Sequence, residues 1–354
     1  MAERTARAPR PSRDGEERHL RLVKPPARRG SAERPARRSA TAAQVSERLL
    51  LLSTGFLVIT GLVMILSASS IAAFEQYGSG FFFFRRQAVA AMAGVVALVV
   101  AARTDHRFWQ RMALPVAITS ALLLAVVLVP GVGRSAYGSS RWLALGSFTL
   151  QPSEIVKFAL LVLVAAIVAA RPDRVGDLGY LGTRVLPPSQ WRTFDPDILL
   201  GIGAVGLIVG MGLIMGADYR RERFFAFLDP WADPTETGWQ LTQGLLAFGS
   251  GGWVGVGIGA SRQKWLYVPN AHTDFIFAII GEELGLIGSL VILAGFVVLL
   301  IAGVRVAVKA TDTFGRLLAS GIVAWFGLQA VVNLGAVTGV LPITGVPLPF
   351  ISYG

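Results

Sequence analysis

Residues 285–304 read Gly-Leu-Ile-Gly-Ser-Leu-Val-Ile-Leu-Ala-Gly-Phe-Val-Val-Leu-Leu-Ile-Ala-Gly-Val and contain no charged side chain. A run of this length is typical of a helix that crosses a hydrocarbon layer of about 30 Å. Comparable apolar runs predict seven crossings in all, at 49–70, 87–102, 112–130, 153–170, 197–216, 285–304 and 317–336. The composition agrees, since 53% of the residues are hydrophobic and 16% are charged. We therefore expect an all-α polytopic membrane protein.

Residues 1–48 form a tail that is rich in Arg, Pro, Ala and Ser and poor in large apolar residues. It holds 13 Lys and Arg against 6 Asp and Glu, so seven of the eleven net positive charges lie there. This composition is typical of disorder and suits contact with anionic lipid or an acidic partner, or simply a solvated tail, rather than nucleic acid. We expect a disordered basic tail at 1–48 and a transmembrane domain at 49–354.

The placement of Lys and Arg in the loops predicts the orientation. The tail and the loops 103–111, 171–196 and 305–316 are rich in basic residues, which places them in the cytoplasm. The segment 217–277 then becomes a large outer loop. Its Gly-rich residues 239–260 are expected to form a re-entrant or interfacial element rather than a crossing. In this orientation Asp274 faces the outside of the cell.

Asp274 is a lone carboxylate where the outer loop meets an apolar segment, and acidic residues at membrane depth are usually kept for function. A purely local explanation has equal weight, with Thr273 as the N-cap and Asp274 at the first position of a helix. His272 is as suited to orient Asp274 or to cap the helix as to react. The residues alone leave both explanations open.

Basic residues also gather in the outer segments, where the orientation rule disfavours them. Arg86, Arg141 and Lys264 are such residues. A ligand with phosphates at the outer leaflet would explain them, because Arg and Lys bind phosphate oxygens. Anchoring to lipid headgroups is the alternative. Glu154 and Lys157 share one helix face inside a predicted span, and we expect a structural pair that faces the bundle interior.

Glu282 and Glu283 lie more than two helical turns beyond Asp274, too far to form a carboxylate pair with it. Gly281 and Gly285 flank them, and we expect polar packing or hinge residues. The chain has no cysteine and only three, widely spaced, histidines. Disulfides, thiol chemistry and a His-cluster metal site are therefore not expected.

Several motifs in order resemble the SEDS family of cell-wall proteins (shape, elongation, division and sporulation), and its division branch more than its elongation branch. The matching strings are Met64-Ile-Leu-Ser-Ala-Ser69, Arg86-Gln87, Arg141-Trp142-Leu143, Gln151-Pro-Ser-Glu-x-x-Lys157, Arg223-x-x-Ala-Phe-Leu-Asp-Pro230, Gly249-Ser-Gly-Gly252 to Gln263-Lys264, His272-Thr-Asp-Phe-Ile-Phe277 and Pro347-Leu-Pro-Phe-Ile-Ser-Tyr-Gly354. The resemblance implies a SEDS-type helical bundle. It further implies a peptidoglycan glycosyltransferase that polymerises lipid II at the outer face of the cytoplasmic membrane during septal wall synthesis, with catalysis dependent on Asp274.

The implied chemistry suits a single carboxylate. Undecaprenyl pyrophosphate leaves without an acid, so one general base for the acceptor's 4-hydroxyl suffices if cations stabilise the leaving group. The candidate cations are Arg86, Arg141, Lys264 and Lys157, and a divalent ion (Mg²⁺ or Mn²⁺) is a further candidate. The same motifs supply Glu154, Gln263, His272, Thr273 and Ser352 as candidate substrate-binding residues.

The resemblance implies a class B penicillin-binding transpeptidase as partner, together with other divisome proteins and membrane lipid. Two other functions stay open. A lipid II flippase should show continuous charge towards the cytoplasm, and a non-catalytic division scaffold should tolerate the loss of Asp274. The family usually has ten crossings and a Pro-Asp-Leu-Gly motif between the fifth and sixth. Here we count seven crossings, find no such motif, and expect the family's last helix to be missing after Gly354.

Overall fold

A computed structural model describes residues 33–127, 129, 133–136, 139–145, 148–170, 216, 224–269 and 271–353. The chain divides into two compact units, Met1–Ala42 and Ala43–Gly354, and the packing below is that of the second unit. The predicted cytoplasmic loop at 171–196 and all but the last residue of the predicted span at 197–216 lie outside the described residues.

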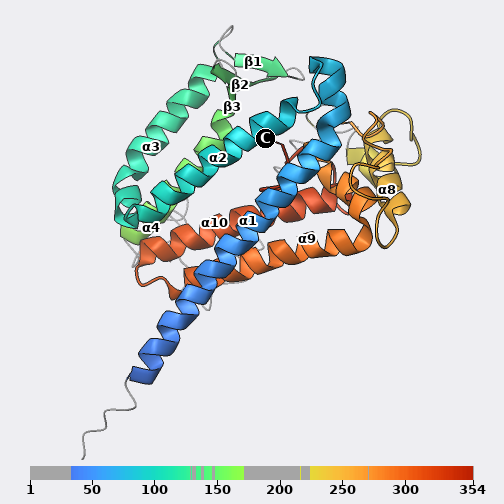
Figure 1. Ribbon diagram of the computed structural model, residues 1–354. Helices are drawn as coiled ribbons and strands as arrows, with labels where there is room; N and C mark the ends of the chain where they lie inside the picture. The colour runs from blue at the N-terminus through green and yellow to red at the C-terminus, as the bar shows by residue number, and fades with distance from the viewer. Residues whose placement is uncertain are drawn as a thin grey trace, which may run out of the picture. The chain divides into compact units, whose positions relative to one another are not determined.

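Seven helices form most of the described structure (Figure 1). They are α1 (Glu33–Tyr77), α2 (Phe82–Arg103), α3 (His106–Val127), α4 (Pro152–Ala170), α8 (Trp239–Gly251), α9 (Ile276–Lys309) and α10 (Thr313–Val337). All but α8 contain a stretch that is long and apolar enough to cross a membrane, and these six correspond to predicted spans. Six of the seven predicted spans are therefore confirmed, and the chain is a multi-pass membrane protein.

The first helix begins earlier than the sequence predicts. α1 starts at Glu33, within the range assigned to the disordered tail. Its first turns are rich in Ala, Arg and Glu, which are good helix formers and need no apolar neighbour to stay helical. Hydropathy alone therefore marks only the part of α1 that suits the hydrocarbon layer.

A small antiparallel sheet lies between α3 and α4, at 133–150. Its strands are β1 (Gly133–Ala136), β2 (Ser139–Leu145) and β3 (Phe148–Leu150), in the order β1-β2-β3. Arg134 pairs with Trp142, and Leu143 pairs with Leu150. The predominantly helical class is confirmed, but the all-α expectation needs this correction. Strands of three to seven residues contain too few positions for alternation to reveal them.

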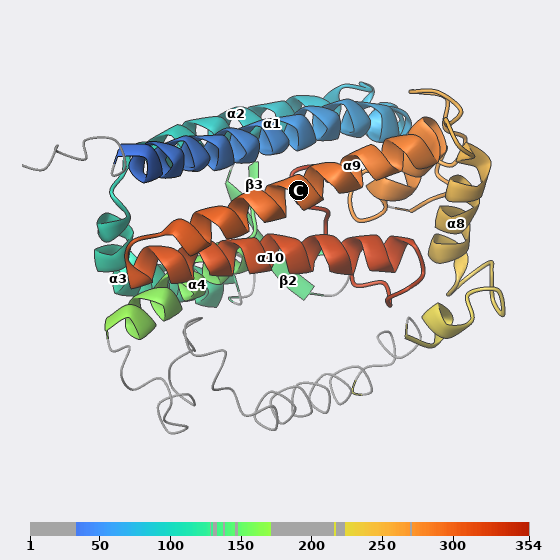
Figure 2. The same cartoon turned by 90° about the horizontal axis from the view of Figure 1, so that it is seen from below.

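The membrane-spanning helices α3, α4, α10 and α9 pack side by side in that order. α9 and α10 lie side by side, α4 packs against α10, and α3 packs against α4 (Figure 2). The helices α3, α4 and α10 share an apolar core of their own, in which Ala113 of α3, Val162 and Ala165 of α4, and Phe314 of α10 are buried together.

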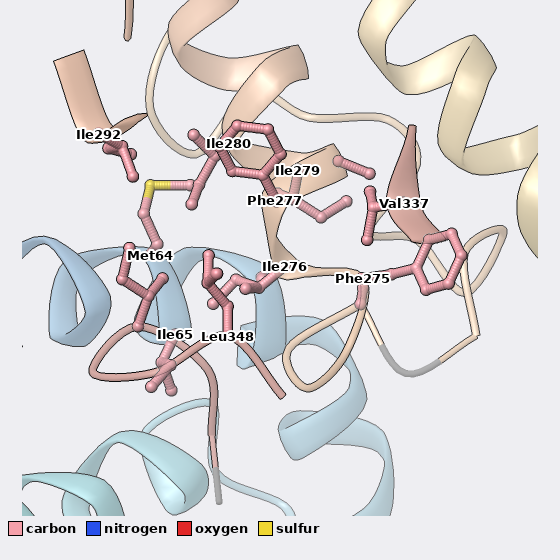
Figure 3. Close-up of a cluster of buried hydrophobic side chains, with 14 of the residues drawn as sticks. Met64, Ile65, Phe275, Ile276, Phe277, Ile279, Ile280, Ile292, Val337 and Leu348 are labelled. Carbon is pink, nitrogen blue, oxygen red and sulfur yellow. The ribbon is translucent and has the colours of Figure 1, made fainter. Parts of the chain in front are cut away.

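The larger core joins α1 to the start of α9 and to the C-terminal loop (Figure 3). Met64 and Ile65 of α1 are buried with Ile276 of α9 and Leu348 of that loop. Gly61 lets the loop approach this closely, because a Cβ there would lie 2.6 Å from the carbonyl oxygen of Phe350. Ala271 and Phe275, which lie on either side of Asp274 in the sequence, belong to this core.

α9 is broken at Gly285, whose φ is +67° and whose ψ is −167°. The loop that follows α8 inserts into the break and supplies the backbone hydrogen bonds that the helix loses there. Four such bonds are formed, Val256 N to Glu282 O, Gly257 N to Glu283 O, Leu286 N to Gly252 O, and Ile287 N to Trp253 O. Backbone groups at membrane depth must be satisfied within the protein, so the break and the loop depend on each other.

Two features of this region agree with the sequence. Residues 239–260 do not form a crossing, because α8 has 13 residues and spans only about 20 Å. Of the two roles expected for Glu282 and Glu283, polar packing is what the buried hydrogen bonds of both carboxylates show, and α9 breaks beside them at Gly285.

Candidate active site around Asp274

Asp274 lies in a turn that precedes α9. Residues 271–275 form turns, and α9 begins at Ile276 with Phe275 at its N-cap. The predicted capping role of Thr273 and helical position of Asp274 are therefore wrong. The ring of Phe275 is buried, and a Cβ at Gly244 of α8 would lie 2.8 Å from it, so this packing sets where the helix begins. The Thr273 hydroxyl instead donates to Asp274 Oδ1 at 3.0 Å.

Asn333 of α10 fixes the backbone of this turn. Its Nδ2 donates to the carbonyl oxygen of Asp274 and to that of Val346, both at 2.8 Å. One helical turn earlier, Gln329 donates to the carbonyl oxygen of Pro347 at 3.0 Å. The loop that follows α10 thus crosses the Asp274 turn, and a Cβ at Gly345 would lie 4.0 Å from Asp274 Oδ2. Asp274 itself is 9% exposed.

Sequence reasoning missed Asn333. Its signal was an amide side chain inside the apolar run of α10, where a polar group without a buried partner would be costly. The side chain is 1% exposed, which is the environment that makes such a group structurally decisive.

His272 lies in an aromatic cluster beside the turn. Its ring centroid is 4.5 Å from that of Phe83 in α2 and 5.7 Å from that of Tyr353. The Tyr353 N–H donates to the His272 carbonyl oxygen at 2.9 Å. Burial lowers the pKa of His272 to about 4, so the imidazole is neutral at pH 7. His272 therefore orders the turn and cannot act as a cation at that pH.

Arg86 is the predicted cation that the structure brings to this cluster. It lies in the first turn of α2, with its Cζ 5.5 Å from the ring centroid of Phe82. Burial raises the pKa of Tyr353, and the positive charge of Arg86 opposes that shift. Arg86 thus lies near enough to Tyr353 for its charge to act on the phenol, and Tyr353 in turn packs on His272.

Lys264 lies in a buried ion pair. Its Nζ is 3.2 Å from Glu283 Oε1, and it also donates to Ser67 Oγ of α1 at 3.3 Å and to the Gly259 carbonyl oxygen. Both partners are nearly inaccessible, Lys264 at 6% and Glu283 at 1% exposure. Three acceptors match the three donors of an ammonium group. The structure thus gives Lys264 a buried protein partner, and its contact with the pyrophosphate stays a prediction.

Glu282 binds the same loop at a second point. Its carboxylate accepts hydrogen bonds from the Ser261 hydroxyl and from the backbone N–H groups of Arg262 and Gln263, the last two at 2.9 and 3.3 Å. Gln263 therefore takes part through its backbone. We call Ser67, Ser261, Lys264, Glu282 and Glu283 the carboxylate clamp. It closes the segment 261–283, within which Asp274 lies, and ties that segment to α1.

The remaining predicted residues lie elsewhere. Glu154 and Lys157 form the expected ion pair at 2.7 Å, but both side chains are nearly half exposed and so are not buried in the bundle interior as expected. Lys157 Nζ lies 5.4 Å from the ring centroid of Trp325 on α10. Ser352 Oγ accepts from the Leu348 N–H at 2.8 Å and so closes a turn of the C-terminal loop. Arg141 is in β2, and its side chain is outside the described part. Among the described residues, no group of three or more His, Cys, Asp or Glu is placed to hold a metal ion.

Comparisons with known proteins agree with the motifs. A family model described as "Cell cycle protein", for FtsW, RodA and SpoVE, matches residues 47–186 and 189–354. "Probable peptidoglycan glycosyltransferase FtsW" of Geobacter metallireducens is 43% identical over 333 residues, 86% of this chain and 89% of that protein. "Stage V sporulation protein E" of Bacillus subtilis is 36% identical over 86% of this chain and 91% of its own.

Two solved structures share the fold. A chain from work on "Structural coordination of polymerization and crosslinking by a peptidoglycan synthase complex" has a TM-score of 0.65 and 28% identity, over 86% of this chain and 91% of that one. The rod shape-determining protein RodA of Thermus thermophilus has a TM-score of 0.54 and 29% identity, over 86% of this chain and 89% of that one. Motifs, family model and fold agree, and the chain belongs to the FtsW/RodA/SpoVE family of cell cycle proteins.

Proposed function

We propose that this protein is a peptidoglycan glycosyltransferase that polymerises lipid II, with Asp274 as its general base. The observation that carries the proposal is the fixed position of Asp274, whose backbone carbonyl is held by Asn333 and whose carboxylate accepts from Thr273. A relative with 43% identity carries the name peptidoglycan glycosyltransferase. A base must be positioned before it can contribute to rate, and a turn held from α10 supplies that positioning.

In the proposed reaction the acceptor's 4-hydroxyl oxygen attacks C1 of the donor sugar. The bond between C1 and the pyrophosphate oxygen breaks, and the pyrophosphate leaves with the electron pair. The hydroxyl proton passes to the Asp274 carboxylate. Because the charge develops on the pyrophosphate, a nearby cation stabilises the transition state, and Arg86 is the residue we assign to that role.

The structure narrows the choice of residues that could stabilise the charge on the leaving pyrophosphate. Lys264 is occupied by Glu283, and Lys157 is paired with Glu154, so neither is our first choice. A divalent ion (Mg²⁺ or Mn²⁺) stays a second candidate for stabilising the charge on the pyrophosphate. Addition of a chelator to the polymerisation assay tests this point, because activity that survives it needs no such ion.

The proposal includes a location and a partner. We place the N-terminus in the cytoplasm and Asp274 outside the cytoplasmic membrane, because Lys and Arg concentrate in the tail and the short loops predicted to be cytoplasmic. Similarity to a protein named FtsW supports a place at the division septum. The partner is a class B penicillin-binding transpeptidase. A structural neighbour that comes from a peptidoglycan synthase complex supports such an assembly.

The test is polymerisation of lipid II by the purified protein with its cognate transpeptidase. Asp274→Asn and Asp274→Ala should lower the rate by roughly 10² to 10⁴, the usual contribution of a general base. Glu236→Gln, an acid-to-amide change at an exposed position of the same predicted outer loop, should leave the rate unchanged. Full activity in both Asp274 variants would remove this residue from the mechanism. Glycan from neither wild type nor variant, with folding and partner binding intact, would favour a scaffold.

A further inference from the structure

We propose that the loop inserted into α9 dips into the membrane leaflet on the side of Asp274 and contacts lipid. The side chains concerned are large, apolar and exposed, and we call them the apolar rim. They are Trp253, Val254, Val256, Ile258, Trp265, Leu266 and Tyr267. The proposal concerns the membrane contact of this loop and needs no assumption about catalysis.

The exposure of the apolar rim is unusually high for such residues. Trp253 is 72% exposed, Val254 75% and Ile258 63%, and no charged residue occurs between positions 253 and 261. So many exposed large apolar side chains in one loop indicate a contact with membrane or protein rather than with water. The sequence predicts a re-entrant or interfacial element at 239–260, and the exposure of these side chains favours the interfacial alternative.

The backbone joins the apolar rim to a surface that already faces lipid. Leu286 and Ile287 begin the second half of α9, and their N–H groups donate to the carbonyl oxygens of Gly252 and Trp253 at 2.9 and 3.1 Å. Leu286 and Ile287 are 44% and 52% exposed, as are Leu290 and Val291 further along, at 53% and 51%. The loop thus continues the exposed apolar face of a membrane-spanning helix.

The length of α9 gives the depth of this junction. Leu286 and Arg305 lie 19 positions apart with no charged side chain between them, and Arg305 is exposed. At about 1.5 Å per residue this distance is about 29 Å, one hydrocarbon thickness. If Arg305 marks one headgroup region, as cationic side chains at helix ends do, then Leu286 lies at the opposite boundary. The loop hydrogen-bonded to residues 282–287 therefore lies at that boundary too.

The residue types agree with an interfacial depth. Trp and Tyr are enriched where hydrocarbon meets headgroups, and the apolar rim contains Trp253, Trp265 and Tyr267. Arg262 is exposed between the two parts of the rim, where its guanidinium can reach lipid phosphates. Leu266, within the rim, holds a φ of +67°, a costly conformation for a residue other than glycine. Figure 2 shows α8 and its neighbouring loops beside the N-terminal end of α9.

The absence of cysteine from the sequence makes depth directly measurable. Single cysteines at Trp253, Ile258 and Trp265 would be labelled with a nitroxide in vesicles of phosphatidylethanolamine and phosphatidylglycerol. Collision rates with oxygen, which enters the bilayer, and with a water-soluble nickel complex then report depth. Val291→Cys is the lipid-facing control, and Glu236→Cys is the water-facing control in the same predicted outer loop.

We expect the rim positions to show an oxygen-to-nickel collision ratio several-fold above that at Glu236 and below that at Val291. Ratios equal to the Glu236 value would overturn the proposal, because the loop would then be in water. Low collision with both reagents would overturn it as well, because the rim would then be covered by protein. Val254→Cys gives an independent reading if one of the variants misfolds. Since the measurement needs no turnover, its failure would leave the proposed glycosyltransferase intact.

Discussion

Asn333 donates a hydrogen bond of 2.8 Å to the carbonyl oxygen of Asp274, although 59 positions separate the two residues in the sequence. The same nitrogen holds Val346 in the loop that crosses the Asp274 turn. The conformation of the proposed base therefore depends on α10, a helix that contributes none of the charged residues predicted for the site.

Asn333→Leu removes this link while keeping a side chain of similar size. We expect the rate of lipid II polymerisation to fall by about 10²-fold, the cost of a small misplacement of a catalytic group, with little change in KM. Gln329→Leu is the matched control, because Gln329 lies on the same helix face and binds only Pro347 among the contacts described for it. Losses of equal size in both variants would show that α10 holds the loop and not Asp274.

The carboxylate clamp predicts a stability effect that separates two roles for Lys264. Lys264→Met leaves Glu283 buried without its cation and should cost about 3–5 kcal/mol of unfolding free energy. The double variant Lys264→Met/Glu283→Leu should recover most of that loss, because an apolar pair replaces an ion pair. Thermal unfolding in detergent measures both changes.

Activity of the same double variant decides the role. Recovered polymerisation would confirm that Lys264 acts through the clamp. A stable but inactive double variant would return Lys264 to the pyrophosphate. Lys157→Met is the control for an ion pair that is nearly half exposed, where the expected loss of stability is at most about 1 kcal/mol.

The broken helix predicts a contrast between two glycines of nearly equal φ, +67° at Gly285 and +69° at Gly78. A Cβ at Gly78 meets nothing within 4 Å, so Gly78→Ala should cost only backbone strain, about 1–2 kcal/mol. A Cβ at Gly285 would lie 2.3 Å from the Gly255 nitrogen and would expel the inserted loop. Gly285→Ala should therefore lower the melting temperature far more. Similar shifts for the two variants would mean that the loop is not needed to hold the break.

His272 predicts a pH dependence of stability. Its pKa is about 4 in the folded protein and 6.5 in the unfolded chain, so the unfolded chain binds the extra proton between these values. The stability that comes from burying the neutral imidazole is fully present above pH 6.5, and it is lost as the pH falls towards 4. His272→Phe keeps an aromatic ring beside Phe83 and Tyr353 but cannot titrate. Between about pH 7.5 and about pH 5, the melting temperature should fall more for the wild type than for His272→Phe. Equal falls in the two proteins would refute the burial of this imidazole.

The sequence predicts the spans well because each needs only one continuous property. Hydropathy over about 20 residues identifies α9 and α10 without any knowledge of their neighbours. The Glu154–Lys157 pair was equally predictable, since i,i+3 spacing places both side chains on one helix face.

What the sequence could not predict depends on contacts between distant segments. Lys264 looks like an outer-surface cation until Glu283 and Ser67 are brought to it by folding. Thr273 looks like an N-cap until the packing of Phe275 delays the start of α9. Asn333 carries no motif at all, and only its two carbonyl partners reveal its role. Local patterns decide where helices run, and long-range polar contacts decide what surrounds Asp274.

The break at Gly285 also sets a height. The helical segment 286–304, called the rod below, matches one hydrocarbon thickness. The carboxylate clamp and the inserted loop fasten the Asp274 segment to the end of this rod. A bilayer that is thinner or thicker than this rod creates a hydrophobic mismatch, which a helix relieves by tilting or by deforming the lipid around it. Since Asp274 is fastened to the end of the rod, acyl chain length would move it relative to the headgroups. The rate of the enzyme should therefore be tuned by membrane thickness, with an optimum where the rod and the bilayer have equal length.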